Sequence, residues 1–203
     1  RYYLHADAPA NTRAGGGTLS TTPPGDEPPD SYAYDPSDPV ATRGGNTLII
    51  PQGVADQGPV EDRQDVLVYT SEALERELEV TGPIKVHLFA SSSAVDTDFT
   101  AKLVDVRPDG YAHNLQDGII RTRFRTSRYE PSMIEPGRVY AFVIDLWATS
   151  HLFKTGPRVR VEISSSNFPR FDRNTNTGNI IAEDTELRPA PQTGVIDVKK
   201  EYC

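Results

Sequence analysis

The sequence lacks several features that would point directly to a function. Cys203 is its one cysteine, so an intrachain disulfide is excluded and a thiolate metal site has no second ligand. The longest apolar runs, such as residues 139–147, are interrupted by charge and are far too short to span a membrane. No charged-then-apolar signal segment is seen, which favours the cytoplasm. We expect no membrane partner, and we expect Arg1 to follow a further domain of a larger protein.

Excess positive charge and a serine-nucleophile motif are also absent. The chain has 21 lysines and arginines against 29 aspartates and glutamates, and this net charge of −8 argues against a nucleic-acid partner. An α/β-hydrolase exposes its serine in a G-x-S-x-G sequence, and none is present. Two serine triplets, at residues 91–93 and 164–166, lack glycines at the required offsets. We interpret them as small packed residues, and we expect no catalytic residue in this chain.

No group of residues in the sequence has the full ligand spacing that a metal ion or a cofactor requires, so we expect neither. The histidines are scattered, without the H-x-H or H-x-x-x-H pairs of zinc sites. Positions 1, 3, 5 and 12 of a calcium-loop pattern are matched by Asp172, Asn174, Asn176 and Glu183. Thr177, however, stands where that loop needs glycine. The favoured interpretation is a loop whose Asx side chains bond their own backbone, with calcium binding as the alternative.

Turn-forming residues are abundant, above all in residues 1–60. The chain has 15 glycines and 17 prolines, and residues 21–30 read TTPPGDEPPD. Proline lacks a backbone donor and glycine weakens regular elements, so long strands or helices are not expected there. Tyr32, Tyr34 and Leu48 supply apolar anchors that disordered linkers usually lack. We predict an irregular but ordered arm over residues 1–60, packed on a domain formed by residues 61–203.

From residue 65 onward, alternate residues are apolar, as in half-buried antiparallel strands. The alternation is found at residues 84–88, 99–103, 120–124, 139–144 and 159–163. Pro108-Asp109-Gly110 predicts a hairpin turn between two of these segments. In residues 139–144 both alternating sets are apolar, which predicts burial on both faces. Strands with regular turns of this kind predict an all-β jelly-roll β-sandwich.

Aspartates near the strand at residues 99–103 are the other candidates for chemistry. Asp96 and Asp98 precede this strand, and Asp105 falls on its inward face. Buried acids are rare unless they are paired or hydrogen-bonded. The candidate partners are Arg121, Arg123, Arg125 and Arg128. We predict a structural salt-bridge ladder in preference to general acid–base catalysis.

Several long phrases of the sequence resemble one known family. They are RQDVLVY at residues 63–69, LEVTGPIKVHLFASSSAVDTDFTAKLVDVRPDG at 78–110, DGIIRTRFR at 117–125 and SSSNFPRFDRNTNTG at 164–178. With shorter matches from residue 32 onward, the chain resembles the C-terminal non-catalytic domain of the X-Pro dipeptidyl-peptidase and cocaine esterase group of serine hydrolases. The family's closing strand is altered here, and residues 195–198 are the candidate replacement.

The resemblance implies a galactose-binding-domain-like jelly roll that follows an α/β-hydrolase catalytic domain and its helical cap. Those two parts of the parent chain would be its partners, and the chain would be an accessory domain of a dipeptidyl-peptidase or acyl esterase, not catalytic alone. The implied wall of the substrate pocket is Leu48, Ile49 and Ile50. The implied domain-interface loop contains Asn167, Phe168, Arg170, Phe171, Asp172 and Asn174.

Two other functions stay open at the level of sequence. A free-standing jelly roll could bind carbohydrate or calcium, with Tyr140 and Trp147 as its clustered aromatic residues. The domain could also seal a homo-oligomer interface, since a lost closing strand leaves an open sheet edge. The substrate of the parent hydrolase is not determined by these residues, because substrate choice belongs mostly to a pocket outside them.

Overall fold

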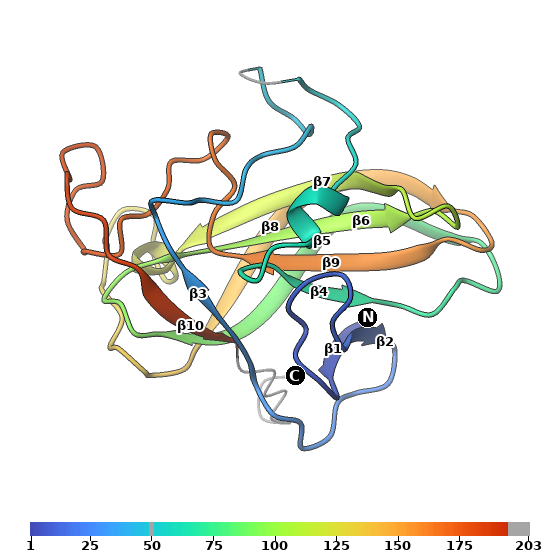
Figure 1. Ribbon diagram of the computed structural model, residues 1–203, viewed down its shortest axis with the longest axis horizontal. Coiled ribbons are helices and arrows are strands. Elements are labelled where there is room, and N and C mark those ends of the chain that lie inside the picture. Colours follow the sequence, from blue (N-terminus) through green and yellow to red (C-terminus); the bar gives the residue numbers. More distant parts are fainter. Residues whose placement is uncertain (49–50, 195–203) are drawn as a thin grey trace.

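Two β-sheets packed face to face make up the protein (Figure 1). The computed structural model describes residues 1–48 and 51–194. Within these residues one sheet has six strands and the other has four. The all-β jelly-roll sandwich expected from the alternation of apolar residues is therefore confirmed.

The strands are short near the N-terminus and long in the middle of the chain. Their bounds are β1 (Tyr3–Ala6), β2 (Gly17–Ser20), β3 (Asp30–Tyr34), β4 (Leu67–Thr70), β5 (Leu78–Ser92), β6 (Asp98–Val106), β7 (Ala112–Arg121), β8 (Tyr140–Phe153), β9 (Arg158–Ser164) and β10 (Ala190–Gly194). The helical segments are α1 (Gly58–Glu61) and the 3₁₀ turn η1 (Thr122–Phe124). In the described part of the chain no helix is long and apolar enough to cross a membrane.

Both sheets contain strands from the N-terminal arm. The sheet orders are β1-β2-β4-β9-β6-β7 and β3-β10-β5-β8, so residues 1–60 supply two strands to one sheet and one to the other. The boundary at residue 60, between the arm and the domain formed by residues 61–203, stays a prediction. The strand that completes the smaller sheet is β10, between β3 and β5. The candidate closing strand at residues 195–198 lies outside the described residues.

The space between the two sheets is filled by inward-facing side chains, which come from every second residue of each long strand. Phe99 of β6 and Phe142 of β8 meet there with ring centroids 5.1 Å apart. Ile144 of β8 and Ile163 of β9 are buried beside them. Each such side chain contributes roughly 1.5–3 kcal/mol on burial. This inter-sheet layer is therefore the main apolar source of stability.

Buried hydroxyl groups attach the arm to the core. The Tyr69 hydroxyl donates to one oxygen of Asp30 at 2.8 Å, and the other oxygen accepts the Ala10 backbone N–H at 2.9 Å. The Tyr34 hydroxyl donates to the carbonyl of Asn174 at 3.0 Å. Burial raises the pKa of Asp30, while these donors oppose the shift. Because the buried polar groups bond one another, the arm can pack closely on the sandwich.

The outer face of the six-stranded sheet is covered by the arm, so the polar set of this sheet does not face solvent. Lys102 of β6 and Glu162 of β9 are 6% and 3% exposed. Lys102 Nζ lies 3.3 Å from Glu162 and donates to the Gln57 amide oxygen at 2.9 Å. Arg160 pairs with Glu61 at 2.5 Å. Figure 1 shows α1, which contains Glu61, lying over this sheet.

This layer of buried charge changes the acidity of one carboxyl group. Desolvation and the neighbouring Glu162 raise the pKa of Glu61 to about 8, although Arg160 opposes the shift. One oxygen of Glu61 and one of Glu162 are buried without a hydrogen-bond partner. A proton held by Glu61 relieves the repulsion between the two carboxyl groups.

Thermal stability should therefore decline through Glu61 as pH rises from about 4.5 to about 8. Its contribution is complete below the ordinary pKa of 4.5 and is lost as pH rises through about 8. The side chain of Glu61→Gln is neutral at every pH, so we expect Tm to fall less with rising pH in this variant. In a domain of this size, a change of 1 kcal/mol in the free energy of unfolding corresponds to about 2–4 °C in Tm. Calorimetry from about pH 5 to about pH 9 measures this. Glu72→Gln, at a side chain 98% exposed, is the control, and equal declines in all three proteins would contradict the assignment.

The prediction that residues 139–144 are buried on both faces is wrong for this chain. β8 buries Phe142 and Ile144 against the core. Val139 and Val143, which belong to the other set, are 44% and 45% exposed. The reason is that the arm covers the other sheet, and no described segment covers this face of β8.

The strand predicted at residues 120–124 ends earlier than expected, at Arg121. Asp96 accepts hydrogen bonds from the Thr122 hydroxyl at 2.8 Å and from the Arg123 backbone N–H at 2.9 Å. These two bonds turn the chain into η1. A local carboxylate acceptor thus overrides the strand pattern.

The predicted ladder of aspartates and arginines forms at one end of β6 only. Asp98 pairs with Arg121 at 2.9 Å, and Asp96 pairs with Arg123 at 2.8 Å. Asp105 instead bonds His151 at 2.9 Å, so an arginine partner for it was a wrong expectation. In the antiparallel register Arg121 lies opposite Asp98, at the other end of β6 from Asp105, and the other candidate arginines follow it in the chain.

Candidate functional site

Residues 44–48 and 51–55 form two limbs that project from the sandwich, and we call them together the projecting loop (Figure 1). The Gly45 N–H donates to the Gly53 carbonyl at 2.7 Å, and the Gly53 N–H donates back at 3.0 Å. Gly44 has φ +63°, and a Cβ there would lie 2.4 Å from the Gly53 oxygen, so glycine is required. Leu48 is 94% exposed. The hydrogen-bonded limbs, and not packing of Leu48, therefore set the direction of this loop.

β7 holds the base of the loop through Asn114. Its side-chain oxygen accepts the Ala55 N–H at 2.7 Å, and its amide nitrogen donates to the Gly53 carbonyl at 3.3 Å. The pairing of β6 with β7 shifts by one residue here, so that Leu115 is left without a partner. Such a bulge changes the direction in which neighbouring side chains point.

The segment around Phe168 lies directly beside the strand-like residues that lead into this loop. The Phe168 N–H donates to the Val40 carbonyl at 2.9 Å, and the Thr42 N–H donates to the Phe168 carbonyl at 2.7 Å. Phe168 itself is 39% exposed. The structure thus places the predicted interface loop beside residues 40–42, which lead into the loop that contains Leu48.

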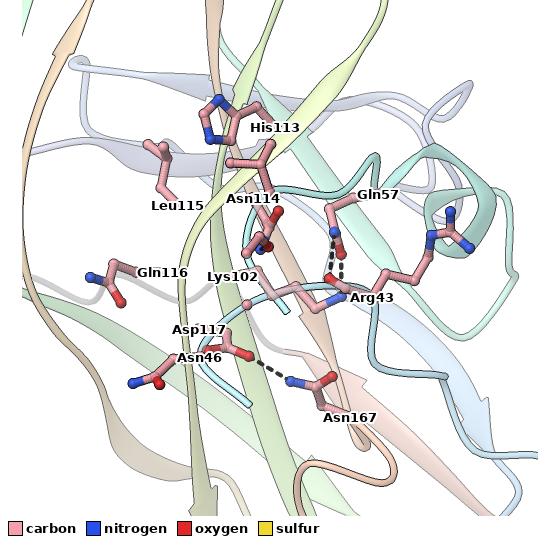
Figure 2. A pocket seen from close by; sticks show the side chains of 13 residues that line it. Arg43, Asn46, Gln57, Lys102, His113, Asn114, Leu115, Gln116, Asp117 and Asn167 are labelled. Carbon is pink, nitrogen blue, oxygen red and sulfur yellow. Dashed lines mark hydrogen bonds between the residues drawn. The ribbon is translucent and has the colours of Figure 1, made fainter. Parts of the chain in front are cut away.

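A buried ion pair supports both segments. Arg170 Nη1 lies 2.8 Å from Asp117, with side chains 11% and 12% exposed. The other oxygen of Asp117 accepts the Asn167 amide at 2.8 Å (Figure 2). A Cβ at Gly45 would lie 3.2 Å from Arg170 Nη1, so the guanidinium group also touches the loop.

A cavity of about 350 Å³ lies between the loop and β7 (Figure 2). Its walls include Asn46 of the loop, Lys102 of β6, and Asn114 and Asp117 of β7. His113 also lines it, and burial lowers the pKa of this histidine. Because the cavity separates the loop from the sheet, hydrogen bonds rather than apolar packing hold the loop above it.

Asn174, the central residue of the calcium-like pattern, is used inside the chain. Its amide nitrogen donates to Asp96 and to Asp98, both at 2.8 Å, and its oxygen accepts the Asn176 N–H at 2.9 Å. The Asn174 side chain is therefore not free to hold a cation. Among the described residues, no group of three or more histidine, cysteine, aspartate and glutamate side chains is placed to hold a metal ion.

Other residues considered for chemistry are engaged in packing. The Ser165 hydroxyl lies 2.8 Å from the Tyr32 hydroxyl, and Ser166 accepts a backbone N–H at 2.8 Å. The Tyr140 ring is covered by Arg125, whose guanidinium carbon is 4.6 Å from the ring centre. These serines therefore lack an adjacent base, and Tyr140 does not present an open face for a sugar.

The predicted site residues occupy different environments. Leu48 is exposed, whereas Ile49 and Ile50 lie outside the described residues. In the predicted interface loop, Asn167 and Asn174 are buried. Phe168 and Asp172 of that loop are exposed, whereas Arg170 and Phe171 are half-buried. Sequence analysis missed Asn114 and Asp117, although the broken alternation at residues 112–117 was a signal for a bulge.

Comparison with known proteins identifies the family. Residues 1–197 match the family described as the X-Pro dipeptidyl-peptidase C-terminal non-catalytic domain. The chain belongs to this family. The cocaine esterase of Rhodococcus sp. (strain MB1 Bresler) is 54% identical over 185 residues, which cover 90% of this chain and 32% of the esterase. The resemblance found in the sequence is confirmed.

Solved structures share the fold over nearly the whole chain. An α-amino acid ester hydrolase superposes with a TM-score of 0.82 at 30% identity, covering 95% of this chain and 33% of that one. An aminopeptidase from a marine sediment Thaumarchaeota archaeon gives 0.81 at 30% identity, covering 96% and 34%. The chain thus spans about a third of the length of the relatives it matches.

Removal of Asp117 should destabilise the domain strongly. Asp117→Ala leaves Arg170 and Asn167 buried without their shared acceptor, a type of change that costs about 3–5 kcal/mol. Urea unfolding measures the loss. Glu135→Ala, which removes the partner of Arg138 from a pair whose side chains are 60% and 70% exposed, should have little effect. Equal losses in the two variants would contradict the supporting role of Asp117.

Proposed function

We propose that this chain is the accessory domain of an α/β-hydrolase-type serine hydrolase. It packs on the catalytic domain and helical cap of the parent protein and shapes the substrate entrance, without being catalytic alone. The observation that carries the proposal is the loop that presents Leu48, 94% exposed, from a hydrogen-bonded base. An apolar side chain held away from its own core is suited to contact a partner surface or a substrate.

The neighbouring Phe168 segment supports the same role. Phe168 is 39% exposed beside the base of the loop, so the two can form one contact surface. Phe168 and Asp172 would contact the catalytic domain, while Asn167 and Asn174 support their segment from inside. Leu48 would line the entrance, together with Ile49 and Ile50. Since the relatives are named as an esterase, an ester hydrolase and an aminopeptidase, we infer an ester or amide substrate for the parent protein.

The chain by itself should not hydrolyse esters, because it lacks a G-x-S-x-G motif and its serine triplets have no adjacent base. Ser20 lies 3.1 Å from His5 Nε2, but this nitrogen also lies 2.9 Å from the Thr22 carbonyl and donates its proton there. A fluorogenic ester assay on the purified 203-residue chain tests this. We expect a rate equal to that of buffer. Turnover that persists at constant specific activity through successive purification steps would overturn the accessory role.

In the full-length hydrolase, Leu48→Ala should change substrate preference and leave the chemical step intact. Loss of an apolar contact with a bulky acyl group should raise KM for an aromatic ester by about fivefold, with kcat nearly unchanged. The matched control is Val143→Ala, which shortens another aliphatic side chain, 45% exposed on β8. The entrance role fails if the two variants have the same KM for p-nitrophenyl benzoate.

A further inference from the structure

We propose that Asn114 is a positioning residue for the substrate entrance, and that it sets which acyl groups the parent hydrolase accepts. This inference rests on the entrance role proposed for Leu48. Asn114 lies in β7, below the projecting loop, and acts on substrate only through that loop. Its effect is therefore on substrate binding and not on the chemical step.

Both hydrogen bonds of the Asn114 side chain go to the limb of the loop that contains Gly53 and Ala55. Its side chain accepts the Ala55 N–H at 2.7 Å and donates to the Gly53 carbonyl at 3.3 Å. The same carbonyl accepts the Gly45 N–H at 2.7 Å. The limb that contains Gly53 is thus held directly, and the limb that leads to Leu48 is held through it.

The cavity beneath the loop makes this support necessary. A space of about 350 Å³ lies between the limbs and the sheet, so the limbs have room to move toward β7. Two charged side chains of the cavity, Lys102 and Asp117, are already engaged elsewhere. Lys102 bonds Gln57 and Glu162, and Asp117 bonds Arg170 and Asn167. If the side chain of Asn114 is removed, the limbs lose two hydrogen bonds and have room to move inward.

Inward movement would withdraw Leu48 from a bulky acyl group. We expect Asn114→Ala to raise KM for p-nitrophenyl benzoate by about fivefold. The net free energy of one hydrogen bond that holds the loop in position corresponds to a factor of about this size in binding. KM for p-nitrophenyl acetate, whose acyl group is small, should change by less than about twofold. The value of kcat should also change by less than about twofold for both esters. A purely structural loss would reduce the active fraction and so lower kcat without changing KM.

The experiment uses the full-length hydrolase and measures kcat and KM for both esters. Gln116→Ala is the matched control, because it removes a nearby amide of the same strand that donates to the Ala148 carbonyl at 2.8 Å and not to the loop. Asn114→Asp keeps the acceptor for the Ala55 N–H and should restore most of the wild-type KM. The double variant Leu48→Ala/Asn114→Ala should match Leu48→Ala, since the two residues act in one pathway.

The outcomes separate this inference from the function on which it rests. If Leu48→Ala raises KM for the benzoate but Asn114→Ala behaves like Gln116→Ala, the positioning role is overturned and the entrance role stands. If Leu48→Ala has no effect on KM, both are overturned. If Asn114→Ala lowers kcat equally for both esters at unchanged KM, Asn114 is a structural residue only and the inference is overturned.

Discussion

The path of the N-terminal arm depends on a layer of charge enclosed between the arm and the six-stranded sheet. Lys102, Arg160 and Glu162 belong to the sheet, and none of them could stay buried without partners. An unpaired buried ion costs several kcal/mol, so the arm must bring Gln57, and α1 at its end must bring Glu61, to these positions. Once α1 is fixed there, the chain that precedes it can cross the sheet in only a few ways. The base of the projecting loop follows from that constraint.

The projecting loop combines a fixed base with an exposed end. Its base is formed by backbone bonds between Gly45 and Gly53 and by the side chain of Asn114. Leu48, by contrast, makes no contribution to the core of this domain. Local hydrogen bonds between polar groups therefore hold the loop, whereas the surface that it presents is apolar. This arrangement suits an element whose contacts are completed by another domain.

Much of the fold could be predicted because side chains alternate along a strand. Phe99 and Leu103 face the core, as their spacing indicates, and Pro108-Asp109-Gly110 forms the turn between β6 and β7. Alternation indicates which residues share a face, but not what covers that face. For this reason Val143 was predicted to be buried and is exposed, whereas Lys102 belongs to a polar set and is buried.

By itself, the sequence determined the sheet class, the family and the absence of a serine-nucleophile motif, because these depend on local pattern and on long specific phrases. Only the tertiary structure placed the loop with Leu48 beside the Phe168 segment, and Asn114 beneath it. It also decided that Asp105 pairs with His151 and not with an arginine. These contacts join residues far apart in the chain. They depend on strand register and on the bulge in β7, and a break in alternation indicates a bulge without saying which distant residues it brings together.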